Sequence, residues 1–234
     1  MKKTFLSTAI VSVLALSSAS VLAHEAGDIL LRVGLTTVAP DASSSPILAG
    51  GADLGQSLGL GSLLVDVDNN TQLGLNFAYF LTDNINVEVL AATPFKHDIE
   101  FLGTKLGETK HLPPTVTVNY FFADPSAKFQ PYVGAGLNYT IFFSEDFDQG
   151  AVETVQTVTE GAVISNLDLD ASFGLSLQAG ADYEVSDGIY INASIRYIDI
   201  DTEASFDING AAGGSISTVE IDPWVYTLSV GYKF

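Results

Sequence analysis

The chain has 234 residues, of which 28 are acidic and 9 are basic, so its formal net charge at pH 7 is −19. Phosphate contacts require a basic surface, and this charge therefore argues against a nucleic-acid partner. Charged residues make up only 16% of the chain, against about 25% in soluble domains. Beyond the N-terminus no run of about 18 apolar residues occurs, which excludes a helical membrane protein. A surface short of charge fits contact with lipid.

The N-terminal segment has the form of a secretory signal peptide. Lys2 and Lys3 precede an apolar stretch from Phe5 to Leu16, and the small-residue site Val21-Leu22-Ala23 follows. We therefore expect cleavage after Ala23, with residues 1–23 as the signal peptide and residues 24–234 as a single exported domain.

Eight later segments alternate bulky apolar residues with small or polar ones at the two-residue period of a β-strand. In chain order they cover residues 29–36, 72–81, 85–91, 115–122, 132–141, 173–183, 189–197 and 224–234. In a transmembrane β-barrel the bulky residues face lipid and the others line the lumen. A soluble barrel or sandwich remains the alternative, but a bore of eight strands is too narrow for four to six bulky inward groups per strand.

The connectors between these segments alternate in length. Short ones lie near Asp83, Asp124 and Asp187, and long ones cover about 38–71, 93–113, 144–170 and 207–218. With both termini in the periplasm, the first, third, fifth and seventh connectors are extracellular, and these are the long ones. The sequence therefore predicts an all-β fold: an eight-stranded, antiparallel, up-and-down transmembrane barrel with short periplasmic turns and long extracellular loops.

Three groups of side chains follow from the strand faces. Opposite charges and amides on the lumen side are expected to pair as a polar plug, because an unpaired buried charge is costly; they are Arg32, Asn76, Glu88, Asn119, Gln178, Asp182 and Arg196. Inward apolar residues nearer the outside are expected to form a hydrophobic vestibule: Leu30, Leu90 and Phe142. Lipid-facing aromatics near strand ends predict girdles, Phe143, Phe173 and Trp224 outside and Phe122, Tyr183, Tyr232 and Phe234 on the periplasmic side.

The pattern offers no site for catalysis, a cofactor or a metal. His24, His97 and His111 are the only histidines, and none has a nucleophile at an identifying spacing, so we interpret His97 and His111 as ordinary loop residues. The third long loop is acidic without a basic residue, which predicts a solvated face. Loose divalent-cation binding that bridges this loop to lipopolysaccharide is the alternative; its acidic residues are Glu145, Asp146, Asp148, Glu153, Glu160, Asp168 and Asp170.

Several segments resemble the OmpW family of bacterial outer-membrane proteins: Thr71 to Ile99, KHLPPT at Lys110 to Thr115, Pro131 to Phe143, YIDIDT at Tyr197 to Thr202, IDPW at Ile221 to Trp224 and the terminal VGYKF. The first loop, from Ala39 to Leu64, is longer and richer in Gly and Ser than the family pattern. The resemblance implies an outer-membrane conduit for small hydrophobic molecules, without a cofactor, that contacts lipid and lipopolysaccharide and releases its solute sideways through the barrel wall. The competing hypothesis is a sealed structural or surface-interaction barrel whose acidic loops bind a partner.

Overall fold

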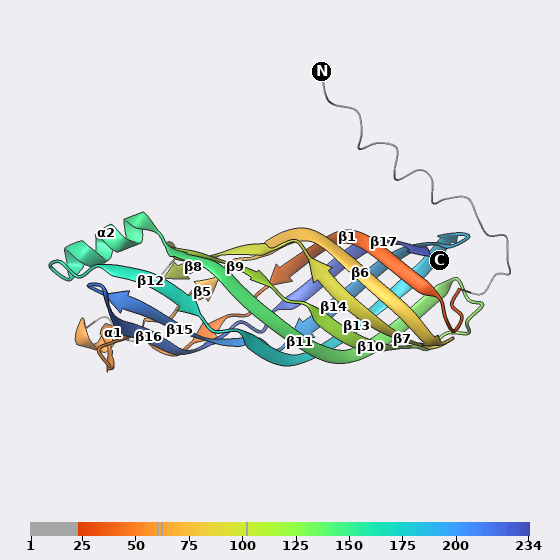
Figure 1. Cartoon of the computed structure of the whole chain (residues 1–234), viewed down its shortest axis with the longest axis horizontal. Helices are drawn as coiled ribbons and strands as arrows, with labels where there is room; N and C mark the ends of the chain where they lie inside the picture. The colour runs from red at the N-terminus through yellow and green to blue at the C-terminus, as the bar shows by residue number, and fades with distance from the viewer. Residues whose placement is uncertain (1–22, 60, 62, 102) are drawn as a thin grey trace, which may run out of the picture.

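The computed structural model describes residues 23–59, 61, 63–101 and 103–234. The predicted signal peptide, apart from Ala23, lies outside the described residues. The described residues form one long, narrow β-structure, with the C-terminus and the short turns at one end and the two helices at the other (Figure 1). Neither helix within the described ranges is long and apolar enough to cross a membrane.

Eight strands close into an antiparallel barrel, as the sequence predicts. The strands are β1 (Ile29–Ala39), β6 (Asn70–Thr82), β7 (Ile85–Ala92), β10 (Thr115–Phe121), β11 (Phe129–Phe147), β13 (Ser172–Ser186), β14 (Ile189–Ile198) and β17 (Trp224–Lys233). They follow one another in the order β10-β7-β6-β1-β17-β14-β13-β11, and pairing of β10 with β11 closes the ring. No edge strand is left in this ring, which is the condition for β-structure in lipid.

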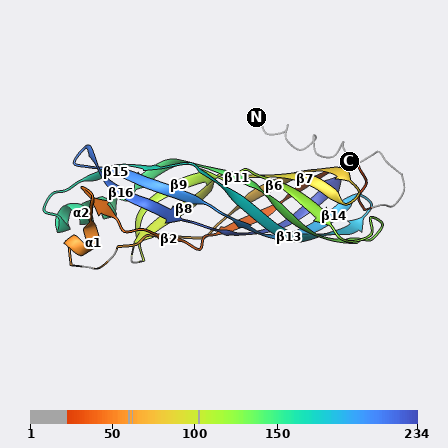
Figure 2. The same cartoon turned by 90° about the horizontal axis from the view of Figure 1, so that it is seen from below.

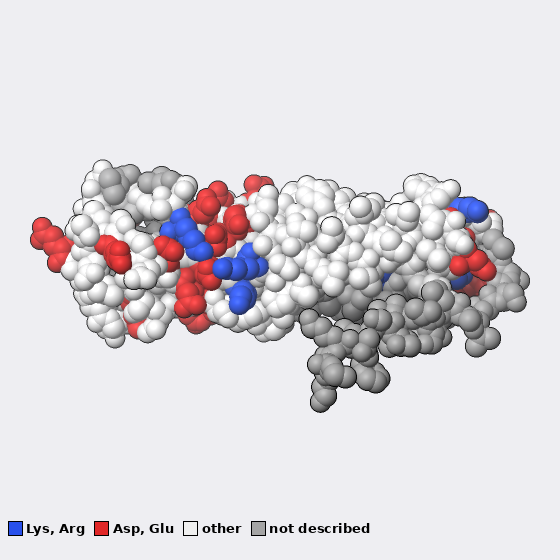
Figure 3. Space-filling view, turned by 90° about the horizontal axis from the view of Figure 1, so that it is seen from above, with Lys and Arg blue, Asp and Glu red and all other residues white. Residues whose placement is uncertain are grey.

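The two faces of the barrel wall differ as the alternation requires. Outward leucines such as Leu35, Leu175 and Leu228 are each more than 60% exposed, while their neighbours along the strand point inward and are buried. Figure 3 shows the consequence as a broad uncharged band between charged residues at the two ends. Such a band is stable in contact with acyl chains and would be costly in water.

The long connectors do not form loops but a β-structured extension of the barrel, which the sequence analysis did not predict. One sheet combines the upper part of β11 with β9 (Thr104–Leu112), β8 (Phe95–Phe101) and β5 (Asp66–Val67). The other contains β12 (Ile164–Leu169), β15 (Asp201–Ile208), β16 (Ala211–Glu220), β2 (Ser43–Ser44), β3 (Leu48–Ala49) and β4 (Ala52–Asp53). Asn209 and Gly210, both with positive φ, form the tight turn that makes β15 and β16 a hairpin.

The helices α1 (Leu54–Ser57) and α2 (Gln149–Val158) lie at the far end of this extension, as Figure 2 also shows from below. Asp148 starts α2, because its carboxylate accepts hydrogen bonds from the backbone N–H groups of Gly150 and Ala151. Val155 and Val158 of α2 face a cavity between the two sheets. The helix therefore covers the open end of the sandwich.

Candidate functional site

An apolar cavity of about 700 Å³ lies between the two sheets of the extension. Its wall is built mainly of aliphatic and aromatic side chains that come from both sheets and both helices, among them Leu54, Leu63, Phe101, Phe142, Val155 and Ile216. A concave, mostly apolar space of this size is typical of a site for a small hydrophobic ligand.

A floor of buried apolar side chains lies under the cavity lining, at the top of the barrel. Val38, Ile198 and Val225 are at most 2% exposed and belong to the same packed cluster as Phe95 and Phe142. This layer separates the cavity from the lumen below it, where the inward side chains become polar.

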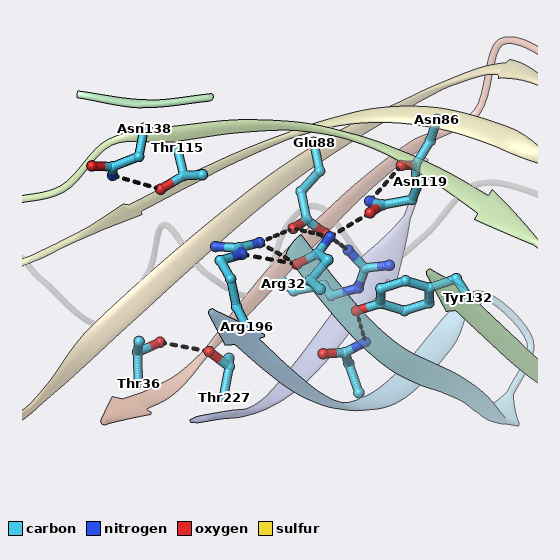
Figure 4. A network of polar contacts seen from close by, with 12 residues as sticks. Arg32, Thr36, Asn86, Glu88, Thr115, Asn119, Tyr132, Asn138, Arg196 and Thr227 are labelled. Atoms are coloured by element: carbon cyan, nitrogen blue, oxygen red, sulfur yellow. Dashed lines mark hydrogen bonds and ion pairs between the residues drawn. The ribbon is translucent and has the colours of Figure 1, made fainter. Parts of the chain in front are cut away.

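A polar network fills the middle of the lumen (Figure 4). The Arg32 guanidinium binds Asp182 through Nε, at 3.0 Å from Oδ1, and Nη2, while Nη1 lies 2.8 Å from Oε2 of Glu88. Arg196 approaches the same carboxylate, with Nη2 2.7 Å from Glu88 Oε1, and its Nε donates to Gln178 at 3.0 Å. Two cations and two carboxylates thus neutralise one another inside the barrel.

Amides extend this network across the bore. Gln178 donates to Asn119, and Asn119 donates to Asn86 at 2.9 Å. Asn76 is also buried in the lumen, but its Oδ1 has no hydrogen-bond partner among the described residues. The structure therefore brings Arg32, Glu88, Asn119, Gln178, Asp182 and Arg196 into one bonded network and places Asn76 beside Arg32 in the sheet, with its Oδ1 unpaired among the described residues.

Aromatic rings occupy the lumen at the short-turn end, below the polar network. Phe80 and Phe121 pack together, and the His24 ring stacks on Phe80 at 4.2 Å between centroids. Tyr132 and Tyr190 complete the cluster. The sequence analysis did not single these rings out, although the inward parity of Phe80, Phe121 and Tyr132 was the signal that could have found them.

Only one of the three predicted vestibule residues lines the cavity. Phe142 does so, whereas Leu90 is buried one level lower, with Asn76 and Thr115 as its strand neighbours. The placement of Leu30 near the outside is wrong: it packs with the aromatic rings at the short-turn end. The reason is chain direction, because β1 starts at that end and Leu30 is opposite Lys233 of the last strand.

The residues expected to form girdles lie on the outer face near the strand ends. Phe173, Phe122, Phe234, Tyr183 and Trp224 are each more than 40% exposed, while Tyr232 and Phe143 are partly buried. The Tyr232 and Phe234 rings pack edge to face, with their centroids 4.8 Å apart. The Trp224 and Tyr197 rings pack with their centroids 5.5 Å apart.

The ladder of the barrel wall is interrupted beside the cavity floor. Pairing between β7 and β10 ends at Leu90 and Thr115, and pairing between β8 and β9 begins only at Phe95 and His111. The intervening residues 91–94 and 112–114 have no ladder partners across this seam. Pro94, Pro113 and Pro114 supply no N–H group there. Each side of this seam is instead hydrogen-bonded to the strand on its other side. The Thr93 N–H donates to the Leu73 carbonyl, and the Tyr139 N–H donates to the Pro114 carbonyl.

The histidines are not loop residues, so that interpretation is wrong. His97 lies on β8 and His111 on β9, both face the cavity, and they are 2% and 4% exposed. His24 is fully buried in the aromatic cluster at the opposite end. The two-residue alternation continues beyond the predicted membrane-spanning segments, and it was the signal that could have placed His97 and His111 on strands.

The acidic residues of the third connector are spread along β11, α2 and β12. Within the described part of the chain, carboxylates close enough to share one ion occur instead at Asp199, Asp201 and Asp222. Burial, together with the two neighbouring carboxylates and Glu220, raises the pKa of Asp201. Tyr197 donates a hydrogen bond to Asp222 at 2.9 Å.

The model of the OmpW family matches residues 25–234. The chain belongs to the OmpW family. It is 43% identical over 240 residues to outer membrane protein W of Vibrio cholerae, with both chains covered completely. The crystal structure of the outer membrane protein OprG from Pseudomonas aeruginosa superposes with a TM-score of 0.81 at 38% identity, covering 92% of this chain and 99% of that one.

The family and the closed barrel place this OmpW-family protein in the bacterial outer membrane, as the sequence analysis expected. A more distant relative, 28% identical over 208 residues with 87% of each chain covered, is named dibenzothiophene metabolism operon protein PahQ, from Pseudomonas aeruginosa. Nothing in these relatives points to catalysis.

Proposed function

We propose that the protein is a passive conduit that takes small hydrophobic molecules into the extracellular cavity and releases them sideways through the barrel wall into the membrane. One observation carries the proposal: the apolar cavity ends on a floor above a polar lumen, and the wall beside that floor lacks ladder pairing between residues 91–94 and 112–114.

The energetics favour the side route over the axial one. A solute with about 200 Å² of apolar surface gives up about 5 kcal/mol when it leaves an apolar site for water or a polar lumen. In the lumen it would also have to separate Arg32 and Arg196 from Glu88, whose ion pairs are buried. Sideways release keeps the solute in apolar surroundings throughout.

The solute class is supported by the cavity lining and by one relative's name. Phe101, Phe142, Phe147 and Phe206 offer aromatic faces to a ligand. The operon name of the PahQ relative refers to a fused aromatic sulfur heterocycle. We therefore include small aromatic hydrocarbons and their heterocyclic analogues among the solutes.

Uptake by cells tests the conduit directly. Cells that lack the gene should accumulate a radiolabelled polycyclic hydrocarbon more slowly than complemented cells, while uptake of a hydrophilic sugar stays equal. Equal hydrocarbon uptake, combined with loss of binding of a phage or surface ligand, would favour the surface-interaction barrel and reject the conduit.

A reversible cross-link tests the lateral exit. The chain has no cysteine, so Ala91→Cys with Pro114→Cys can be linked across the interruption without competing thiols. Linking should reduce hydrocarbon uptake at least tenfold, and reduction should restore it. The matched control, Leu35→Cys with Leu73→Cys, joins a laddered pair on the lipid face and should change nothing. Full uptake through the linked seam would reject this exit.

The proposal also includes contact with lipopolysaccharide. Lys96 and Lys110 stand opposite each other on β8 and β9, and Lys110 is paired with the girdle residue Phe143. Like charges directly opposite are unfavourable unless anions lie between or beside them. Glu108 lies 2.7 Å from Lys96 Nζ, and in this proposal a lipopolysaccharide phosphate supplies the second anion, beside Lys110. Lys96→Gln with Lys110→Gln should weaken lipopolysaccharide binding to the purified barrel; unchanged binding would reject the contact.

The export signal is part of the same proposal. Cleavage after Ala23 makes His24 the first residue of the mature protein, so the N-terminal sequence of protein extracted from outer membranes should begin at His24. A different start, or an uncleaved chain, would reject this boundary.

A further inference from the structure

His97 and His111 form a paired imidazole cluster that lines the cavity. Their Nε2 atoms are 3.0 Å apart, and their ring centroids are 4.9 Å apart. The residues come from neighbouring strands, with Phe95 opposite His111 and Thr109 opposite His97, so the two rings are diagonal neighbours on the same inward face. Phe95 and Phe142 pack against the His111 ring.

The geometry points to a transition-metal site in which His97 Nε2 and His111 Nε2 bind one ion, Cu²⁺ by preference, and the remaining coordination positions open into the cavity. This inference is independent of the proposed conduit. It assigns to the histidine pair a role that the packing of the cavity does not require.

The nitrogen spacing suits two ligands on one metal. At a metal–nitrogen distance of about 2.0–2.1 Å, two cis ligands of a square plane lie about 2.9 Å apart, and two ligands of a tetrahedron lie about 3.3 Å apart. The observed 3.0 Å is closer to the first value. Tetragonal nitrogen and oxygen coordination is typical of Cu²⁺ and Ni²⁺, and Cu²⁺ binds most strongly among divalent first-row ions.

The surroundings of His97 prepare its Nε2 for a metal. Its Nδ1 lies 2.6 Å from the backbone carbonyl oxygen of Asp68, and an Asp68 carboxylate oxygen lies 3.6 Å from the same nitrogen. The Nδ1–H group therefore donates to that carbonyl, which leaves the lone pair on Nε2. Metal-binding histidines almost always have such a partner on the second nitrogen.

The surroundings of His111 leave a nitrogen unsatisfied. Its Nδ1 is buried and has no hydrogen-bond partner among the described residues, while its Nε2 forms the 3.0 Å hydrogen bond to His97 Nε2. Without a metal, the His111 Nε2–H group donates to Nε2 of His97. When an ion binds, that proton can move to the unpaired Nδ1, and His111 Nε2 then offers its lone pair to the metal.

The other candidate cluster does not have these properties. Asp199, Asp201 and Asp222 offer only carboxylate oxygens, which suit Ca²⁺ or Mg²⁺ rather than Cu²⁺. It therefore serves as a control region for the copper experiment, together with His24, which lies at the opposite end of the barrel.

The test uses the mature protein in detergent micelles, without a polyhistidine tag and with its N-terminal amine acetylated, because the amine and imidazole of an N-terminal His24 would themselves chelate Cu²⁺. Titration with Cu²⁺ should show one saturable site per chain, and its electron paramagnetic resonance spectrum should show hyperfine coupling to two imidazole nitrogens. His97→Gln and His111→Gln should each weaken binding at least tenfold, whereas His24→Gln and Asp201→Asn should leave it unchanged.

A second measurement covers variants that fail to fold. In the native protein, Cu²⁺ should selectively broaden the imidazole NMR signals of His97 and His111 and spare those of His24. The proposal is overturned by the absence of saturable binding to the folded native protein, by coupling to fewer than two nitrogens, or by binding that His24→Gln abolishes. A protein that does not bind Cu²⁺ can still take up hydrocarbon, so the metal site and the conduit can be rejected independently.

Discussion

The barrel and its extracellular extension are built by the same two-residue alternation with opposite polarity. In the barrel, leucines such as Leu228 face outward and Arg32 and Glu88 face inward. In the extension, Phe142 and Ile216 face inward, while Lys96 and Glu108 form an ion pair on the outer surface. The medium outside each half decides which face is apolar.

This inversion defines the route of the proposed conduit. The apolar inside of the extension meets the polar inside of the barrel at the layer formed by Val38, Ile198 and Val225. Beside this layer the wall lacks pairing between residues 91–94 and 112–114. The apolar region continues from the cavity to the bilayer only sideways.

The largest expected effect is on the polar inside of the barrel. Glu88→Ala leaves Arg32 and Arg196 without their shared carboxylate and should cost about 3–5 kcal/mol of unfolding free energy, because it creates uncompensated buried charge. Urea unfolding in lipid vesicles, followed by the fluorescence of the single tryptophan, Trp224, measures this loss. Glu88→Gln keeps a hydrogen-bonding group and should lose less. Equal stability of Glu88→Ala and the native protein would refute the role of the network.

Adding a methyl group to a glycine should destabilise the crowded barrel more than the roomier extension. A Cβ atom on Gly136 would lie 2.1 Å from the Val116 backbone oxygen, whereas one on Gly213 would meet nothing closer than 3.6 Å. Gly136→Ala should therefore cost about 1–3 kcal/mol, and Gly213→Ala should be nearly neutral in the same unfolding assay. Similar losses for both would show that the two halves do not differ in packing.

A charge placed on the cavity wall should act on transport. Phe142→Asp puts a carboxylate on an apolar lining, so hydrocarbon uptake should fall about tenfold, which corresponds to about 1.4 kcal/mol. Leu90→Asp lies below the floor and should reduce uptake less, and Ser217→Asp, on an exposed surface, should leave it unchanged. Undiminished uptake by correctly folded Phe142→Asp would contradict the assignment of the cavity.

The smallest effect is expected on the outside of the extension. Lys105 Nζ lies 2.8 Å from Asp98 Oδ1 and 2.7 Å from Glu108 Oε2, and both carboxylates are partly exposed. Bonding to Lys105 and Lys96 lowers the pKa of Glu108 to about 2, but solvent and salt screen such pairs. Lys105→Ala should therefore cost less than about 1 kcal/mol, and high salt should remove that difference. A loss of several kcal/mol would show that this surface is not in water.

The sequence predicted the barrel well because lipid imposes a strict pattern on each strand. Seven of the eight predicted strands lie within three residues of their observed bounds, whereas β11 continues to Phe147, six residues beyond its predicted end. The prediction failed in the extension, where β8 and β9 have charged residues on the water side and an Asn-Gly turn was read as part of a loop. The charged plug residues were identified by parity alone. Strand direction and register around the closed ring decide which of these residues bond to one another. They also decide that Leu30 lies far from Phe142. Neither can be read from one strand at a time.

The order in which a solute reaches two compartments tests the central claim most directly. Vesicles that contain the protein and enclose a cyclodextrin acceptor can be mixed rapidly with pyrene, whose excimer emission reports arrival in the bilayer. The account predicts that excimer emission appears before the acceptor fills and that linking Ala91→Cys to Pro114→Cys slows the excimer phase. Filling of the enclosed acceptor before the bilayer, at a rate unaffected by the link, would contradict it.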